Sequence, residues 1–238
     1  MSRVLSPHPK DPTRMSEPTD TSGIAGYWDR YAAGIAEETR EEALKDAFGW
    51  CQYAGHGPGN ELLGDPLTTL ELGFGRGNAV AALATKGIEA TGIDVSPLQC
   101  EHAIARWGHL TGAHFVQAEA TAYLNDATRQ WDAIYSIWGA LWFTDPDVLL
   151  PLVHERLIPG GRLVFSHAPP VPGAYGVQGM YADGFRGRQV WVYRWAYEPE
   201  GWAALLRKHG YTGIEARVEP APQPDLLGTL IATAHRPR

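Results

Sequence analysis

The sequence predicts an α/β protein with a three-layer, doubly wound fold around a seven-stranded, mostly parallel sheet. Two observations support this prediction. Short apolar runs alternate with longer helical segments over residues 67–167, which is typical of a parallel sheet with helices on both faces. Near the C-terminus, a loop too short for a crossover helix separates two further apolar runs, so the sheet is expected to end in an antiparallel hairpin.

Apolar composition and chain breakers give each element its range. The five parallel strands are expected at Leu67–Gly73, Glu89–Val95, His114–Ala120, Trp131–Ile137 and Gly161–His167. Helices are expected at Asn78–Lys86, Pro97–Leu110 and Asp145–Leu157, and Pro97 suits a first helical turn. The C-terminal third predicts a helix at Pro199–His209 and the two hairpin strands at Thr212–Glu219 and Leu226–Ala234.

The chain divides into three parts. Residues 1–22 are rich in proline and polar side chains, and a mobile tail is expected there. Residues 23–66 form an N-terminal helical unit, with one helical segment over Gly26–Tyr53 followed by a loop. Residues 67–238 form the core, and an unusually long connection at 168–198 is expected to be a substrate-binding insert.

Composition excludes several classes of protein. The net charge of −7 argues against a partner that is held by its phosphates, so no nucleic acid is expected. The two cysteines, Cys51 and Cys100, show no metal-ligand spacing, which predicts no metal site and fits a reducing cytoplasm. The sequence has neither a signal peptide nor an apolar run that could span a bilayer, so a cytoplasmic protein without a membrane partner is expected. The oligomeric state stays undetermined.

The motif that carries chemistry is Glu71-Leu72-Gly73-Phe74-Gly75-Arg76-Gly77, at the turn from the first strand into the first helix. Glycines there let the backbone approach a ligand closely. Asp94 ends the second strand, where a carboxylate can accept both ribose hydroxyls of a nucleoside. The alternative interpretation of this motif is an NAD-dependent oxidoreductase. A dinucleotide fingerprint would need a third glycine where Asn78 stands, and this argues against the alternative.

The acidic-x-Gly-x-Gly-x-Gly pattern resembles motif I of the class I S-adenosylmethionine-dependent methyltransferases. The resemblance extends over roughly Tyr27 to His235. It rests further on Gly92-Ile93-Asp94-Val95-Ser96-Pro97, Ala118-Glu119-Ala120, Trp131-Asp132-Ala133-Ile134-Tyr135-Ser136 and Leu157-Ile158-Pro159-Gly160-Gly161-Arg162-Leu163. It implies S-adenosylmethionine as cofactor, S-adenosylhomocysteine as product, and a lid role for the N-terminal helical unit.

The resemblance also implies which residues bind the donor. Glu71 suits the ammonium group, Asp94 the ribose, and Glu119 the adenine amino group; Tyr27 or Tyr31 of the lid is expected at the methionine carboxylate. The full expected set is Tyr27, Tyr31, Glu71, Gly73, Gly75, Asp94, Val95, Glu119, Ala120 and Ser136. Arg76 is expected to be a solvated side chain.

The acceptor is expected beyond the fourth and fifth strands. His167 is the candidate general base, because an imidazole can take a proton near neutral pH; it could instead only orient substrate. Aromatic side chains are dense around it and in the insert, which suggests a pocket for a planar or partly apolar acceptor. Some of these rings could equally fill a small core, and Gln189–Tyr197 alternates like a strand. The candidate substrate-binding residues are Trp28, Trp138, Trp142, Tyr175, Tyr181 and Trp191.

The predicted function is methyl transfer to a small-molecule acceptor, such as a natural-product or metabolic intermediate, by in-line displacement in an aromatic-lined pocket. A non-catalytic S-adenosylmethionine-binding protein and a methyltransferase acting on protein or nucleic acid stay open. Enzymes that methylate exocyclic amines of nucleic acid carry Asn/Asp-Pro-Pro-aromatic after the fourth strand, where this chain reads Ser136-Ile137-Trp138-Gly139. That difference disfavours the nucleic-acid branch.

Overall fold

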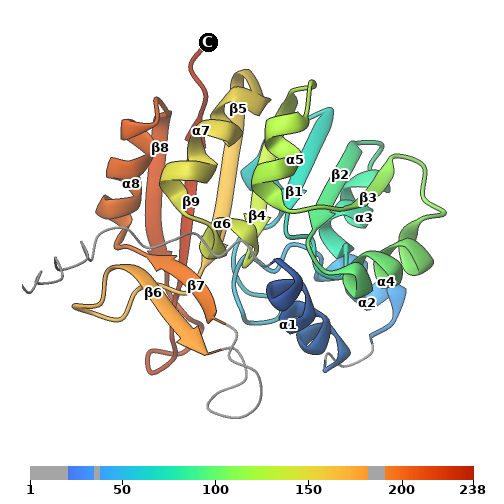
Figure 1. Ribbon diagram of the computed structural model, residues 1–238, viewed down its shortest axis with the longest axis horizontal. Coiled ribbons are helices and arrows are strands. Elements are labelled where there is room, and N and C mark those ends of the chain that lie inside the picture. The colour runs from blue at the N-terminus through green and yellow to red at the C-terminus, as the bar shows by residue number, and fades with distance from the viewer. Residues whose placement is uncertain (1–20, 35–37, 182–190) are drawn as a thin grey trace, which may run out of the picture.

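A computed structural model describes residues 21–34, 38–181 and 191–238 (Figure 1). A seven-stranded sheet in the order β3-β2-β1-β4-β5-β9-β8 runs through its centre. The strands are β1 (Thr68–Leu72), β2 (Glu89–Asp94), β3 (Ala113–Gln117), β4 (Trp131–Ile137), β5 (Leu157–His167), β8 (Thr212–Glu219) and β9 (Thr229–His235). Strands β1 to β5 pair in parallel, whereas β9 is antiparallel to both β5 and β8. The predicted fold class is confirmed.

Helices cover both faces of this sheet and bury two hydrophobic cores. The helices are α3 (Asn78–Ala84), α4 (Pro97–Trp107), α5 (Ala120–Asp126), α7 (Pro146–Arg156) and α8 (Pro199–Lys208). Figure 1 shows α5, α7 and α8 in front of the strands, and their Leu124, Val153 and Trp202 share one core. On the opposite face, Val80 of α3 and Ala103 of α4 belong to the second core. Burial on both faces explains why the parallel strands read as continuous apolar runs.

Helix starts follow the local sequence. The Ser96 hydroxyl accepts a hydrogen bond from the Gln99 N–H at 3.0 Å, and Pro97 occupies the first turn of α4, as the sequence predicts. The expectation that the third strand continues to Ala120 is wrong. It ends at Gln117, because Glu119 caps a helix, α5, that the sequence reasoning missed. A second missed helix, α6 (Ala140–Phe143), is only one turn long.

The N-terminal unit is interrupted where one helical segment was expected. Helix α1 (Thr21–Ala33) ends before the second helix, α2 (Arg40–Lys45), begins. The side chains of Thr39 and Glu42 form a capping box that starts α2 anew. Beyond α2 the chain is non-helical up to the 3₁₀ turn η1 (Asn60–Leu63), and the ring of Trp50 is fully buried against the second core. Residues 1–20 of the expected tail lie outside the described residues.

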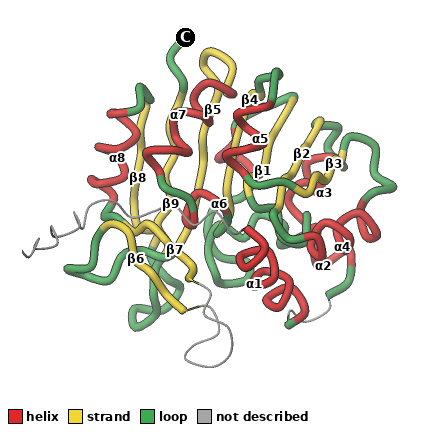
Figure 2. The backbone as a smooth tube through the Cα atoms, viewed as in Figure 1, coloured by secondary structure: helices red, strands yellow, loops and turns green. Residues whose placement is uncertain are grey.

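The insert between β5 and α8 contains a two-stranded hairpin, visible beside the main sheet in Figure 2. Strand β6 (Gly176–Tyr181) pairs antiparallel with β7 (Trp191–Ala196), and β7 packs against α6. The strand expected within Gln189–Tyr197 is therefore present. Its partner β6 was missed, since glycine at 176 and 179 weakens the strand pattern. Among the described helices, none combines the length and apolar character that crossing a membrane requires.

Candidate functional site

The glycine turn follows β1 and is folded tightly against the rest of the site. Gly73 has a positive φ of 84°, and a Cβ there would lie 2.8 Å from the backbone N of Ala140. At Gly77, where φ is 73°, a Cβ would lie 2.5 Å from the Phe115 ring. Both positions therefore require glycine for conformation and for space. The turn presents bare backbone at the carboxyl end of β1.

The structure brings Asp94 to this turn. Its Oδ2 accepts a hydrogen bond from the Gly75 N–H at 2.9 Å, and its Oδ1 accepts one from the Ser96 N–H at 2.9 Å. Burial raises the pKa of Asp94 above its ordinary value, against the lowering effect of these backbone donors. Each carboxylate oxygen has two lone pairs, so both retain capacity to accept a further donor. Val95, beside it, is half-buried.

Glu71 points into the second core. Its side chain is 3% exposed, and the Tyr135 hydroxyl donates to its Oε2 at 3.2 Å. Burial raises the pKa of Glu71 well above its ordinary value. A buried carboxyl with one phenol partner lies beneath the glycine turn rather than open beside it.

Glu119 and Ser136 are engaged within the protein. The Glu119 carboxylate caps α5, accepting from the N–H groups of Thr121 at 3.0 Å and Ala122 at 2.8 Å; Ala120 is buried as the first residue of that helix. The buried Ser136 hydroxyl donates to the Leu72 carbonyl at 2.8 Å. It thereby joins the ends of β4 and β1, next to the glycine turn.

Helix α1 docks on α4 through a contact that the sequence reasoning missed. Asp29 Oδ1 accepts from the Ser96 hydroxyl at 2.5 Å and from the Leu98 N–H at 3.3 Å. Of the expected lid residues, Tyr27 is half-buried and Tyr31 is 58% exposed. Trp28 meets Phe143 of α6 edge to face, with ring centroids 4.8 Å apart. Helix α1 thus spans from α4 to the acceptor side.

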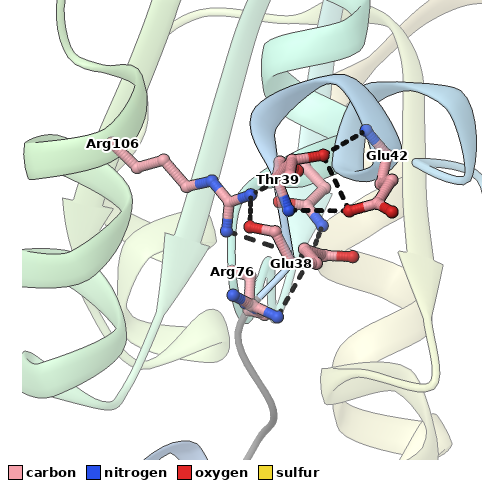
Figure 3. A network of polar contacts seen from close by, with 6 residues as sticks. Glu38, Thr39, Glu42, Arg76 and Arg106 are labelled. Atoms are coloured by element: carbon pink, nitrogen blue, oxygen red, sulfur yellow. Dashed lines mark hydrogen bonds and ion pairs between the residues drawn. The ribbon is translucent and has the colours of Figure 1, made fainter.

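A polar network clamps the segment that follows α1 onto the glycine turn (Figure 3). Glu38 Oε1 lies 2.9 Å from Nη1 of Arg76, inside the turn, and accepts from Asn78 Nδ2 at 3.0 Å. Arg106 of α4 donates to the backbone carbonyls of Glu38 and Thr39 at 2.9 and 2.8 Å. The expectation that Arg76 is merely solvated is wrong, because its guanidinium is half-buried against Glu38.

His167 ends β5 in a sandwich of aromatic rings. Its imidazole stacks on Trp142 at 5.6 Å between centroids with 7° between planes, and Phe165 lies on it at 5.9 Å. Nδ1 lies 2.7 Å from the Ala168 carbonyl, while Nε2 has no hydrogen-bond partner in the described part of the chain. Complete burial lowers the pKa of His167 to about 4. The ring is therefore neutral at neutral pH, with Nδ1 donating and Nε2 carrying the free lone pair.

Trp138, directly after β4, has an unusual backbone conformation. It has a φ of 51°, the left-handed region that bulky residues rarely adopt. Its indole N–H donates to the Trp50 carbonyl at 2.8 Å, and its ring meets Trp142 edge to face. Backbone strain of this kind is concentrated at functional sites.

A cavity of about 230 Å³ lies between α6 and the β6–β7 hairpin. Its walls come from α6, the chain after β5, the β6–β7 hairpin and the loop before β9: Trp142, Ala168, Pro169, Pro170, Val171, Pro172, Gln178, Arg194, Ala196 and Leu227. Trp142 is the one predicted acceptor residue in this wall. Sequence reasoning missed Gln178 and Arg194, although an arginine inside the aromatic run Trp191–Ala196 was a usable signal.

The other predicted acceptor residues lie elsewhere. The Tyr175 hydroxyl donates to Glu198 Oε1 at 2.6 Å, on the surface. Trp191 is 44% exposed and stacks on Tyr193. The side chain of Tyr181 lies outside the described residues. Neither Tyr175 nor Trp191 lines the cavity.

Comparison with known proteins agrees with this geometry. Residues 69–161 match the family described as "Methyltransferase domain". Over 116 residues, 46% of this chain and 44% of the relative, the sequence is 33% identical to a trans-aconitate 2-methyltransferase of Paracidovorax citrulli. A second trans-aconitate 2-methyltransferase, from Methylobacterium radiotolerans, is 35% identical over 41% of this chain and 36% of its own length. The chain thus matches less than half of each curated relative.

Solved structures show the fold over a longer span. The 1,6-didemethyltoxoflavin-N1-methyltransferase of Burkholderia thailandensis, solved with bound 1,6-didemethyltoxoflavin and S-adenosylhomocysteine, superposes with a TM-score of 0.63 at 21% identity. That comparison covers 98% of this chain and 100% of the other. A putative S-adenosylmethionine-dependent methyltransferase from Listeria monocytogenes gives 0.60 at 17% identity, over 83% of this chain and 99% of the other.

The sheet order and its antiparallel last pair are those of the class I methyltransferase fold. Residues 69–161 match the methyltransferase domain family, and the likeness to solved methyltransferases extends the same fold over nearly the whole chain.

Proposed function

We propose that this chain catalyses the transfer of a methyl group from S-adenosylmethionine to a small organic acceptor. The observation that carries the proposal is the hydrogen bond from the Gly75 N–H to Asp94 Oδ2. It brings a glycine-rich turn and a carboxylate together at the ends of β1 and β2. Ligands of open α/β sheets bind at that edge.

The residues present suit an adenosyl donor. Gly73 and Gly75 carry no side chain, so a ligand can approach the backbone closely at these two positions of the turn. Asp94 keeps acceptor capacity on both oxygens, which matches two ribose hydroxyls. We assign the amino-acid end of the donor to the glycine turn above the buried Glu71, with Tyr27 as its proposed partner, and the adenine to the start of α5 near Glu119.

When bound there, S-adenosylmethionine supplies a methyl carbon already activated by its sulfonium. The protein's own contribution is alignment of the acceptor and exclusion of water. The contact between Trp28 and Phe143 closes α1 over the acceptor side, and Trp138 and Trp142 wall the same region. His167 holds Trp142 by stacking, with its Nε2 as a neutral hydrogen-bond acceptor.

For the acceptor we infer a metabolic or natural-product intermediate. Support comes from the curated relatives, which are named for trans-aconitate, and from a structural neighbour named for a toxoflavin precursor. A neutral alcohol must lose its proton as it is methylated, and a base whose pKa lies near 4 is a poor acceptor for that proton. A carboxylate or a neutral amine needs no such base, and trans-aconitate is the first acceptor to try.

Calorimetric titration with S-adenosylmethionine, S-adenosylhomocysteine and NAD tests the donor. We expect binding of the first two and none of NAD. Incubation with methyl-labelled donor and trans-aconitate, with mass analysis of the product, tests transfer. Binding of NAD alone would contradict the proposal and favour an oxidoreductase. Donor binding without methylation of any acceptor in a broad panel of acids, amines and phenols would make it a binding protein.

A further inference from the structure

Arg194 is a cation in a mostly apolar cavity, and no carboxylate of the described residues balances its charge. It lies on β7 and is half-buried among the cavity walls. No aspartate or glutamate of the described residues lies within ion-pair distance of its guanidinium, whereas Arg76 and Arg129 each have such a partner. Burying a charge beside apolar groups is costly unless an opposite charge compensates for it.

The guanidinium is held in a fixed orientation. Its Nε donates to Gln178 Oε1 at 3.1 Å, and its Cζ lies 5.6 Å from the centre of the Trp142 ring. Gln178 is itself oriented, because its Nε2 donates to the Ala174 carbonyl at 2.7 Å. Gln178 and Trp142 thus fix the guanidinium of Arg194 from two sides, and neither carries a negative charge.

The remaining donors form a fork that suits an oxyanion. A guanidinium has five N–H donors, of which the Nε–H is used on Gln178. The Nη groups make no hydrogen bond within the described residues, so they are available for two parallel bonds to one carboxylate or phosphonate. The other cavity walls are mostly apolar side chains, including Pro169, Pro172 and Leu227, which suit a carbon skeleton.

We propose that Arg194, oriented by Gln178 and Trp142, anchors an oxyanion group of the methyl acceptor, which is therefore an organic anion. This inference rests on the proposed function, because it assigns the cavity to the acceptor. Arg194 acts in recognition and alignment. It fixes one end of the acceptor against the Trp142 ring, and Trp142 in turn stacks on His167 at the end of β5.

Binding measurements on the protein saturated with S-adenosylhomocysteine test this assignment. The probes are propane-1,2,3-tricarboxylate, its uncharged triamide, and ethylphosphonate. The variants are Arg194→Met, which keeps the apolar stem, and Arg194→Lys, which keeps the charge without the fork. Arg207→Met, at an exposed arginine on α8, is the matched control.

We expect an anion to bind the wild type and the control equally. Arg194→Met should weaken that binding roughly tenfold to a hundredfold, the range for losing a charge-assisted pair of bonds. Arg194→Lys should fall between, and the triamide should bind weakly to every variant. Whether the tricarboxylate or the phosphonate binds more tightly identifies the oxyanion.

Three results would overturn the assignment: equal anion affinity in Arg194→Met and wild type, equal affinity of the wild type for triamide and tricarboxylate, or no binding of either anion at millimolar concentration. Binding of S-adenosylhomocysteine must survive in all variants, which also shows that they fold. A wild type that does not bind S-adenosylhomocysteine would instead contradict the proposed function. Failure of the Arg194 assignment and failure of the proposed function are therefore distinguishable.

Discussion

At the scale of single residues, the site depends on a few groups whose partners are distant in sequence. Motif spacing predicted Gly73, Gly75 and Asp94 together, because a glycine turn and a carboxylate one strand away are local patterns. Asp29 gave no comparable signal, and Arg194 only its place inside an aromatic run, since their partners Ser96 and Trp142 become neighbours only after folding. The expected base, His167, stands where it was predicted but in an environment that composition could not reveal.

His167 should make stability depend on pH in a defined window. Its pKa is about 4 when folded and about 6.5 when unfolded, so between these values the unfolded chain binds the additional proton. The free energy of unfolding should therefore fall as the pH drops from 6.5 to 4, by up to about 3 kcal/mol from this residue. Denaturant titrations of wild type and His167→Phe over this range measure it.

The difference between the two proteins is the relevant quantity, because other groups titrate in the same range. The phenylalanine ring keeps the stacking on Trp142 and has no proton to gain. If the wild type and His167→Phe lose stability in parallel below pH 6.5, His167 is not buried in neutral form.

Replacing Gly73 with alanine should destabilise the protein far more than the same replacement at another glycine of similar conformation. Gly87 has a φ of 80° and open space within 4 Å of where a Cβ would stand, whereas a Cβ at Gly73 meets the Ala140 backbone at 2.8 Å. Gly87→Ala should cost about 1 kcal/mol for the left-handed conformation alone. Gly73→Ala should cost at least about 2 kcal/mol more and abolish donor binding. Thermal unfolding and calorimetry compare them; equal losses would show that the turn has room for a side chain.

At the scale of elements, polar contacts rather than a continuous helix hold the N-terminal helical unit on the core. The sequence predicted helices and strands well where a clear helix cap or a long apolar run marked the element. It failed at α5 and α6, which are short, and at β6, whose glycines hide the strand pattern. The break between α1 and α2 was encoded in Thr39 and Glu42, a capping box inside a charged run that otherwise reads as helix.

Glu38 should couple the lid to the donor site. Its carboxylate joins Arg76 of the glycine turn to the segment between α1 and α2 (Figure 3). Glu38→Gln weakens a half-exposed network, worth about 1 kcal/mol, so the dissociation constant for S-adenosylhomocysteine should rise about fivefold. The melting temperature should change little. Glu41→Gln, on the exposed face of α2, is the control, and a similar change in both variants would exclude a specific clamp.

At the scale of the whole molecule, every part of the proposed reaction lies at the carboxyl ends of the parallel strands. The carboxyl ends of β1 and β2 carry the glycine turn and Asp94, while β5, α6 and the insert enclose the cavity with Arg194. The antiparallel β8–β9 pair completes the sheet beyond β5. Fold class followed from periodicity and loop length alone. The position of the cavity did not, because it is assembled from segments more than 80 residues apart along the chain, such as Trp142 and Leu227.

Titration of S-adenosylhomocysteine into wild type, Asp94→Ala and Asp126→Ala tests the central claim most directly. Asp126 ends α5 on the surface and is the matched control. Loss of two charge-assisted hydrogen bonds to the ribose should weaken binding by Asp94→Ala roughly a hundredfold, while Asp126→Ala binds as the wild type does. Equal affinity in all three proteins, or no affinity in the wild type, would contradict a donor site built from the glycine turn and Asp94.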